Sequence, residues 1–257
     1  MKKLIVTTAI AGALIGGIGT SASAANNKSS DDLIIINKAV NEEVFIQDGK
    51  LKYQFSVATG KTKDLTPEGN FKIAQKIVNR PYYTGKIPGG DPRNPLGNRW
   101  LGIAIPNKGS AASWGGVYGI HGNNNPASIG TYASGGCIRM LDEEIENKLY
   151  PDVLLNTPVY ITSSYKSFAD IAKEKGYTIF SNPADQIKRT LKYGSRGNDV
   201  IVLQNRLNEL EFSVGKVDGI FGTGTKTAVI KFQKEKKLVA DGIVGTATKN
   251  ALFSLFR

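Results

Sequence analysis

The sequence predicts two folded units of different class: a mainly β domain over residues 25–163 and a small all-α domain over residues 190–257. Apolar and polar residues alternate in the first unit, which is typical of half-buried strands. In the second unit, apolar residues recur at helical spacing and one turn sequence occurs twice. The 257 residues suffice for two cores, and 40% hydrophobic with 21% charged residues excludes disorder as the main state.

The first 24 residues have the layout of a secretory signal peptide. Lys2 and Lys3 precede a mostly apolar stretch over residues 4–18, and Ala-Ser-Ala at residues 22–24 matches a cleavage site. The apolar stretch is interrupted by two threonines and is shorter than the ~20 residues that span a bilayer. We therefore expect cleavage after Ala24, export, and no stable membrane span in the mature chain.

A β-hairpin is predicted early in the β domain. Residues 44–47 and 50–57 have strand character, and alternate residues of the second strand are apolar, so one face is expected to be buried. Asp48 and Gly49 lie between the two strands. Asp-Gly is a favoured pair for a type I′ turn, in which both central residues need positive φ.

The rest of the β domain contains further strands, a long loop and a short helix. Residues 100–105 and 159–161 have strand character. Residues 79–98 are rich in Pro, Gly and Asn and predict a loop, and a loop of this length in a compact domain often walls a binding site. Residues 141–150 predict a helix whose acidic first turn suits the positive end of the helix dipole.

The C-terminal part is predicted to be helical. Residues 164–189 are expected to form a linker with a short helix over 167–175. The turn sequence at residues 218–225 is repeated 23 positions later at 241–248, and each copy places a threonine suited to capping ahead of a helix. The apolar faces are Val200, Leu203, Leu207 and Leu210, then Ala228, Val229 and Phe232, then Ala251 and Leu252.

These C-terminal residues resemble the three-helix peptidoglycan-binding domain that is common in exported wall enzymes. The resemblance covers most of residues 190–252 and includes both copies of the turn sequence. It implies binding to wall glycan or stem peptide; the alternative is a packing or interaction domain. We expect the Asp-Gly turns to be structural in either case.

The scarcity of cysteine and histidine limits the chemistry that the chain can perform. One cysteine excludes an intramolecular disulfide and a Cys-rich zinc site, and one histidine excludes a two-histidine metal site. Acid–base chemistry near neutral pH therefore has to use His121, Cys137 or a perturbed carboxylate or lysine.

The residues around Cys137 favour a nucleophilic role over that of an inert buried thiol. Two glycines, Gly135 and Gly136, precede it, so a substrate can approach the backbone and successive N–H groups can hold an oxyanion. A thiol also needs a base, and His121 is the one histidine that can supply it. Arg139 either binds a substrate carboxylate or is a solvated surface residue.

Both elements resemble the L,D-transpeptidase catalytic domain of the YkuD type. That family has a His-Gly element followed about 15 residues later by a Ser-x-Gly-Cys-aliphatic-Arg element; here these are His121-Gly122 and residues 134–139. Residues 66–71 and 94–100 also look like family elements. The resemblance covers residues 32–162 and implies a β-sandwich-like fold with the cysteine on a loop beside the sheet.

One departure from the family pattern narrows the mechanism. Many members have a second histidine immediately before the Gly-Cys pair, where this chain has Gly135. His121 alone must then act as the base, with its tautomer set by a backbone carbonyl or by Ser134.

The resemblance implies an acyl transfer within peptidoglycan that needs no cofactor and no metal. Cys137 attacks the L-centre carbonyl of a tetrapeptide stem, D-alanine leaves, and a side-chain amine of a second stem resolves the thioester into a 3→3 cross-link. The backbone N–H groups of Gly136 and Cys137 are the expected oxyanion donors. Arg139, Ser134 and Gly135 are the expected substrate-binding residues.

The sequence leaves two alternative functions open and argues against two others. Water could resolve the same thioester, which would make the protein an L,D-carboxypeptidase, and a degenerate catalytic domain would leave a non-catalytic wall-binding protein. A papain-like endopeptidase places cysteine before histidine, and a sortase has a far wider gap between them.

The net charge also bears on partners. The chain carries +11, and residues 190–257 hold 11 Lys and Arg against 6 Asp and Glu. For an exported protein the natural polyanion is a wall or surface polymer, although solubility explains the charge equally well. No nucleic-acid-binding motif is present in the sequence, so peptidoglycan is the expected partner.

Overall fold

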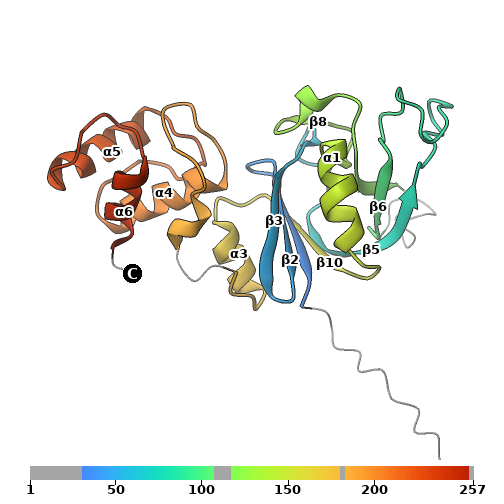
Figure 1. Cartoon of the computed structure of the whole chain (residues 1–257), viewed down its shortest axis with the longest axis horizontal. Helices are drawn as coiled ribbons and strands as arrows, with labels where there is room; N and C mark the ends of the chain where they lie inside the picture. Colours follow the sequence, from blue (N-terminus) through green and yellow to red (C-terminus); the bar gives the residue numbers. More distant parts are fainter. Residues whose placement is uncertain (1–30, 107–116, 180–182, 255–257) are drawn as a thin grey trace, which may run out of the picture.

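The computed structural model describes residues 31–106, 117–179 and 183–254. Figure 1 shows a sheet-rich lobe built from the N-terminal two thirds of these residues and a helical lobe built from the C-terminal third. The predicted signal peptide lies outside the described residues. In the part of the chain that is described, no helix is long and apolar enough to cross a membrane.

An eight-stranded sheet forms the first lobe, with the strand order β3-β2-β1-β10-β5-β6-β7-β9, and β4 and β8 form a separate parallel pair. β1 pairs with β10 and β7 with β9 in parallel, while the other pairs of the large sheet are antiparallel. The strands are β1 (Leu33–Asn37), β2 (Glu42–Gln47), β3 (Lys50–Ser56), β4 (Thr59–Gly60), β5 (Gly69–Val78), β6 (Arg99–Ile103), β7 (Tyr118–His121), β8 (Tyr132–Ser134), β9 (Ile138–Arg139) and β10 (Pro158–Thr162).

The predicted strand positions are confirmed. The hairpin joins β2 to β3, and Asp48 (φ 50°) and Gly49 (φ 72°) both have the positive φ that a type I′ turn needs. β6 and β10 fall in the two other predicted strand segments. Between β5 and β6, residues 79–98 form the expected loop, which contains one isolated bridge between Tyr82 and Ile87.

The main core is shared by two halves of the eight-stranded sheet, one that contains β2 and one that contains β6. This is the sandwich-like arrangement that was expected. Alternate residues of both halves enter one apolar cluster, for example Phe45 of β2 and Leu101 of β6. A helical segment after β9 closes the cluster; it comprises α1 (Asp142–Glu144), the π-helical turn η3 (Ile145–Leu149) and α2 (Tyr150–Asp152). Burial of its apolar side chains holds this segment against the sheet.

The connector contains a helix that packs against the outer face of β1 and β2. This helix, α3 (Phe168–Glu174), starts after Ser167, whose hydroxyl accepts a hydrogen bond from Asp170 N. Phe168 and Ile171 lie in a second apolar cluster with Ile35 and other residues of β1 and β2. The apolar side chains of α3 therefore pack against the sheet, while Phe168 N donates a hydrogen bond to Asn198 Oδ1 (2.8 Å) of the helical lobe. A short 3₁₀ turn, η2 (Pro126–Ser128), lies between β7 and β8, and another, η4 (Pro183–Gln186), follows α3.

The helical lobe contains three helices around its own core: α4 (Asn198–Glu209), α5 (Thr223–Glu235) and α6 (Thr246–Leu252). The two turn repeats are organised by equivalent glutamines. Gln204 Nε2 donates to Asp218 Oδ1 (3.0 Å), Ile220 O (3.1 Å) and Thr225 Oγ1 (3.1 Å). Gln233 Nε2 donates in the same way to Asp241 Oδ1 (3.0 Å), Ile243 O (2.9 Å) and Thr248 Oγ1 (3.1 Å). The Asp-Gly turns are thus structural, as expected.

The expectation that a threonine caps each of these helices is wrong. The N-cap residues of α5 and α6 are Gly222 and Gly245, and neither helix has a side-chain cap. Thr225 and Thr248 are buried inside the first turn because their hydroxyls serve the two glutamines. Each threonine hydroxyl is engaged in a tertiary hydrogen bond and therefore does not cap its helix.

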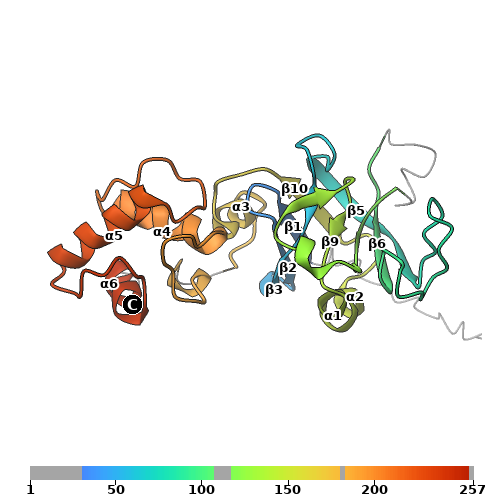
Figure 2. The same cartoon turned by 90° about the horizontal axis from the view of Figure 1, so that it is seen from above.

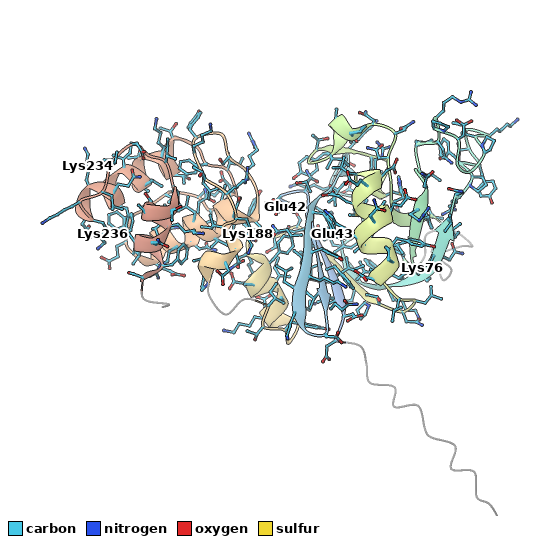
Figure 3. All side chains as sticks on the ribbon, viewed as in Figure 1. Glu42, Glu43, Lys76, Lys188, Lys234 and Lys236 are labelled. Carbon is cyan, nitrogen blue, oxygen red and sulfur yellow. The ribbon has the colours of Figure 1, made fainter. Side chains whose placement is uncertain are left out.

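The two lobes meet at Glu42 of β2. Its carboxylate accepts hydrogen bonds from Asn198 N (3.3 Å) in α4 and from Gln54 Nε2 (3.0 Å) in β3. Figures 2 and 3 show that α3 and the connector lie between the sheet and the helices, with the labelled Glu42 and Lys188 on facing sides. Burial is the main cause that raises the pKa of Glu42 to about 7.

Glu43, the next residue, lies inside the core of the sheet-rich lobe and has no solvent exposure. Figure 3 places it between the β2–β3 hairpin and α1. Within the described residues, neither carboxylate oxygen has a hydrogen-bond partner. Burial, with the nearby Glu144 as a second cause, raises the pKa of Glu43 to about 8, so this side chain is protonated at neutral pH.

Replacing Glu43 by glutamine is expected to change how stability depends on pH. The folded protein keeps the Glu43 proton up to about pH 8, whereas an unfolded glutamate loses it above pH ~4.5, so wild-type stability falls as the pH rises through this window. Gln cannot ionise. The unfolding midpoint of Glu43→Gln minus that of the wild type should therefore increase by roughly 5 °C or more from pH 5 to pH 8. Thermal denaturation measures both midpoints.

The matched control for this prediction is Glu143→Gln, which changes an exposed carboxylate in α1. The difference in unfolding midpoint between Glu143→Gln and the wild type should not change over the same pH range. Parallel pH curves for Glu43→Gln and the wild type would show that Glu43 is ionised in the folded protein.

Candidate active site

The register of the sheet brings the predicted catalytic residues to one face. In the parallel pair of β7 and β9, Ile120 lies beside Ile138 and His121 beside Arg139. Ile120 and Ile138 are in the core, so His121 and Arg139 point to the opposite face. Cys137, two positions before Arg139, shares that face and stands just before β9. His121 is the last residue of β7.

The turn that carries Cys137 is held by two hydroxyl groups. Ser134 Oγ accepts from Gly136 N (3.0 Å) and donates to Cys137 O (2.6 Å). Thr66 Oγ1 donates to Gly136 O (2.9 Å). Gly136 has φ +131°, and a Cβ there would lie 2.4 Å from Leu65 O, so only glycine fits. Residues 65 and 66 therefore support the catalytic turn.

These contacts bear on the roles expected of Ser134 and Gly136. Ser134 is fully buried, and its hydroxyl is used within the turn. The N–H of Gly136 already has an acceptor, so it can serve an oxyanion only after its bond to Ser134 opens. Substrate contact by Ser134 and oxyanion binding by the N–H groups of Gly136 and Cys137 stay predictions.

The tautomer of His121 is set by a backbone carbonyl and not by Ser134. His121 Nδ1 lies 2.6 Å from Gly122 O, so Nδ1 carries the proton and Nε2 is left as an acceptor. Gly122 is itself required, because a Cβ there would lie 1.7 Å from Asp142 Oδ1. That oxygen accepts from Asn123 N (3.0 Å), which ties the segment after β7 to α1.

Burial is the main reason that both predicted catalytic groups are uncharged at neutral pH. Burial first, and then the charges of Arg139 and Arg80, lower the pKa of His121 to about 4, against the raising effect of its bond to Gly122. Burial also raises the pKa of the Cys137 thiol, against the lowering effect of Gly119 N–H and the same two arginines. The thiol donates to Val117 O (3.6 Å). The site is thus a neutral thiol beside a neutral imidazole, and not a preformed ion pair.

The ring of His121 is further supported by Trp100. The two rings are stacked with centroids 5.4 Å apart and an interplanar angle of 13°. Trp100 pairs directly with His121 across β6 and β7, and its side chain is buried. The stack limits rotation of the imidazole and so keeps Nε2 in a fixed direction.

Gly135 and Arg139 are the two remaining predicted substrate-binding residues. Nothing lies within 4 Å of a Cβ built at Gly135, so no neighbour requires glycine there. The buried Nε of Arg139 has no hydrogen-bond partner among the described residues. Substrate binding at Gly135 and Arg139 remains a prediction.

The described residues contain no group of three or more His, Cys, Asp or Glu side chains that could hold a metal ion.

Comparison with known families identifies the sheet-rich lobe. The profile of the L,D-transpeptidase catalytic domain, YkuD, matches residues 31–161. The chain belongs to the YkuD family. A second profile, described as a putative peptidoglycan binding domain, matches residues 196–252 and covers the three helices of the second lobe.

The chain is also similar to individual proteins. The "Putative L,D-transpeptidase YqjB" of Bacillus subtilis is 46% identical over 150 residues, which is 58% of this chain and 81% of that protein. The "Spore cortex-lytic enzyme" of Bacillus cereus is 42% identical over 67 residues, which is 26% of this chain and 24% of that enzyme. Among solved structures, an L,D-transpeptidase from Mycobacterium smegmatis has 23% identity and a TM-score of 0.38, covering 51% of this chain and 58% of that one.

Sequence reasoning missed two features of this YkuD site. Arg80 acts electrostatically on both catalytic groups, but nothing in its local sequence distinguishes it from other surface arginines. Trp100 was noticed as part of a family element, but its stacking on His121 depends on the pairing of β6 with β7. A prediction of strand register would have been needed to find either.

Proposed function

We propose that this protein is an exported cysteine L,D-transpeptidase that cross-links peptidoglycan through a thioester on Cys137. The observation that carries the proposal is the placement of Cys137 and the Nδ1-protonated His121 on one face of the paired strands β7 and β9. A neutral imidazole with Nε2 free to accept a proton is the form that a general base requires. Membership of the YkuD family supports the reaction class.

In the first half-reaction, His121 Nε2 takes the thiol proton and the sulfur attacks the L-centre carbonyl of a tetrapeptide stem. The N–H of Cys137 lies next to the reacting sulfur and is the proposed donor to the oxyanion. The amide C–N bond breaks, the imidazolium returns the proton to the leaving amine, and D-alanine departs. The stem is left as a thioester on Cys137.

In the second half-reaction, the side-chain amine of another stem attacks the thioester carbonyl. His121 Nε2 accepts the amine proton and the thiol is restored, so the net reaction exchanges one amide for another. The product is a 3→3 cross-link. If water takes the place of the amine, the product is a tripeptide stem and the protein is an L,D-carboxypeptidase.

The test is incubation of the mature protein with a defined tetrapeptide-stem fragment, followed by mass spectrometry. We expect a cross-linked dimer and free D-alanine. A shortened tripeptide without dimer would make the protein a carboxypeptidase. No reaction, with binding to purified wall retained, would show a non-catalytic wall-binding protein.

Deleting residues 190–257 is expected to separate binding from chemistry. The helical lobe has its own apolar cluster and contains neither the cysteine nor the histidine. Without it, sedimentation with purified wall should fall by about tenfold or more, because the proposed anchor and the basic excess are lost. The rate of D-alanine release from a soluble stem peptide should change by less than about threefold, since the catalytic core is intact.

The control for the truncation is a thermal unfolding curve, because the deletion removes Asn198, which donates to Glu42. Equal wall binding by the truncated and full-length proteins would place the wall-binding surface on the sheet-rich lobe.

A further inference from the structure

The active site has a second arginine beside the catalytic histidine, in addition to Arg139. The guanidinium carbon of Arg80 lies 3.9 Å from the centroid of the Trp100 ring. That ring stacks in turn on the imidazole of His121. Arg80, Trp100 and His121 thus form a continuous cation–ring–ring contact at the face that carries Cys137.

The fold positions Arg80 through its backbone. Arg80 lies two residues beyond the end of β5, whose Ile77 pairs with Trp100 in β6. Its carbonyl accepts a hydrogen bond from Asn94 Nδ2 (2.9 Å), and the same amide donates to Pro88 O (3.2 Å). Asn94 is buried, so the start and the end of the 79–98 loop are tied together at Arg80. The guanidinium is therefore held by a packed ring on one side and by an anchored backbone on the other.

The positive charge of Arg80 acts on the pKa of both His121 and Cys137. Arg80 and Arg139 both lower the pKa of His121, and both lower the pKa of Cys137. Burial lowers the pKa of Arg80, against the smaller raising effects of Cys137 and Tyr83. Two cations therefore act on the proposed catalytic pair from different segments, one in the loop after β5 and one in β9. This arrangement raises the electrostatic potential where a substrate must lie.

The substrate of the proposed reaction carries carboxylates next to the scissile amide. A tetrapeptide stem ends in the carboxylate of D-alanine, and in stems whose scissile amide follows diaminopimelate that residue adds a carboxylate on its side chain. A planar guanidinium binds a carboxylate through two parallel hydrogen bonds, which fixes both the position and the orientation of the bound group.

We propose that Arg80 is a substrate-binding residue that holds a carboxylate of the donor stem and so sets the scissile carbonyl against Cys137. The inference rests on the proposed function for the identity of the substrate. Arg139 was already expected to bind carboxylate, and Arg80 supplies a second, independently positioned cation. Trp100 is its positioning residue, since the ring that stacks on His121 also contacts the Arg80 guanidinium.

The experiment compares three soluble tetrapeptide stems: one with both carboxylates free, one amidated at the terminal D-alanine, and one amidated on the diaminopimelate side chain. For the wild type, the kcat/KM of D-alanine release should be lower for whichever stem has lost the carboxylate that Arg80 binds. Arg80→Gln should lower kcat/KM for the free stem by about 10- to 100-fold, mainly through KM. It should also remove the difference in kcat/KM between the free stem and that amidated stem. Arg80→Lys should keep part of the preference, because the charge remains without the planar fork.

The matched control is Arg93→Gln. Arg93 lies in the same loop and is highly exposed, where it pairs with Asp91. This variant should retain both the rate and the preference of the wild type. An equal loss on all three stems for Arg80→Gln would overturn the proposal and would make Arg80 a support for Trp100 only.

A binding measurement distinguishes failure of this inference from failure of the proposed function. Titration calorimetry with Cys137→Ala and with Cys137→Ala/Arg80→Gln needs no turnover. The free stem should bind about tenfold more weakly to the double variant, and the amidated stem should bind both proteins equally. If the wild type releases no D-alanine but this difference persists, the proposed reaction is wrong and the carboxylate site stands. If both proteins bind all stems alike, the carboxylate site is wrong, whatever the reaction.

Discussion

Replacing Cys137 by alanine should abolish D-alanine release, with a loss of more than about 1,000-fold, because no other thiol exists to form the thioester. The same variant should show no mass increase after incubation with a tetrapeptide stem, whereas the wild type should gain the mass of the acyl group. Mass spectrometry of the intact protein measures the adduct, and chromatography of the supernatant measures released D-alanine.

Binding to purified wall is the control for this variant. The change removes a half-buried sulfur on the sheet-rich lobe and leaves the helical lobe untouched, so sedimentation with wall should match the wild type. A Cys137→Ala protein as active as its parent would show that the nucleophile has been assigned to the wrong residue.

Loss of His121 is expected to lower the acylation rate by about 100- to 10,000-fold at neutral pH, the usual contribution of a general base. His121→Asn is the better variant, because alanine would leave a cavity beside Trp100. The rate of acyl-enzyme formation in single-turnover experiments measures the effect, and an unchanged unfolding midpoint shows that the fold survives.

The pH dependence adds a second readout for His121. With a pKa of about 4, the imidazole is already neutral at pH 5, so acylation by the wild type should fall only as the pH drops toward 4. Without His121, the rate should instead climb with pH, because the thiolate forms only as the pH approaches the raised pKa of Cys137. A wild-type profile that falls off near pH 6.5 would indicate an imidazole with its ordinary pKa.

Local chemistry predicted much of the secondary structure. Asp48 and Gly49 specify the hairpin because few other pairs accept positive φ at both positions. The apolar spacing along α4 and α5 predicted which faces are buried, since Leu203 and Phe232 are fully enclosed. Local patterns failed at Thr225 and Thr248, where a hydrogen bond from a glutamine on another helix overrides the capping preference.

For the candidate site, the sequence by itself determined which residues can form the predicted catalytic pair, because one cysteine and one histidine leave no competitor for either role. Only the tertiary structure decided the protonation state of that pair. The tautomer of His121 depends on the distance to Gly122 O, and its low pKa depends first on burial in the folded protein. The stacking of Arg80 on Trp100 and of Trp100 on His121 depends on the register of β5, β6 and β7, which is set by side-chain packing across the sheet.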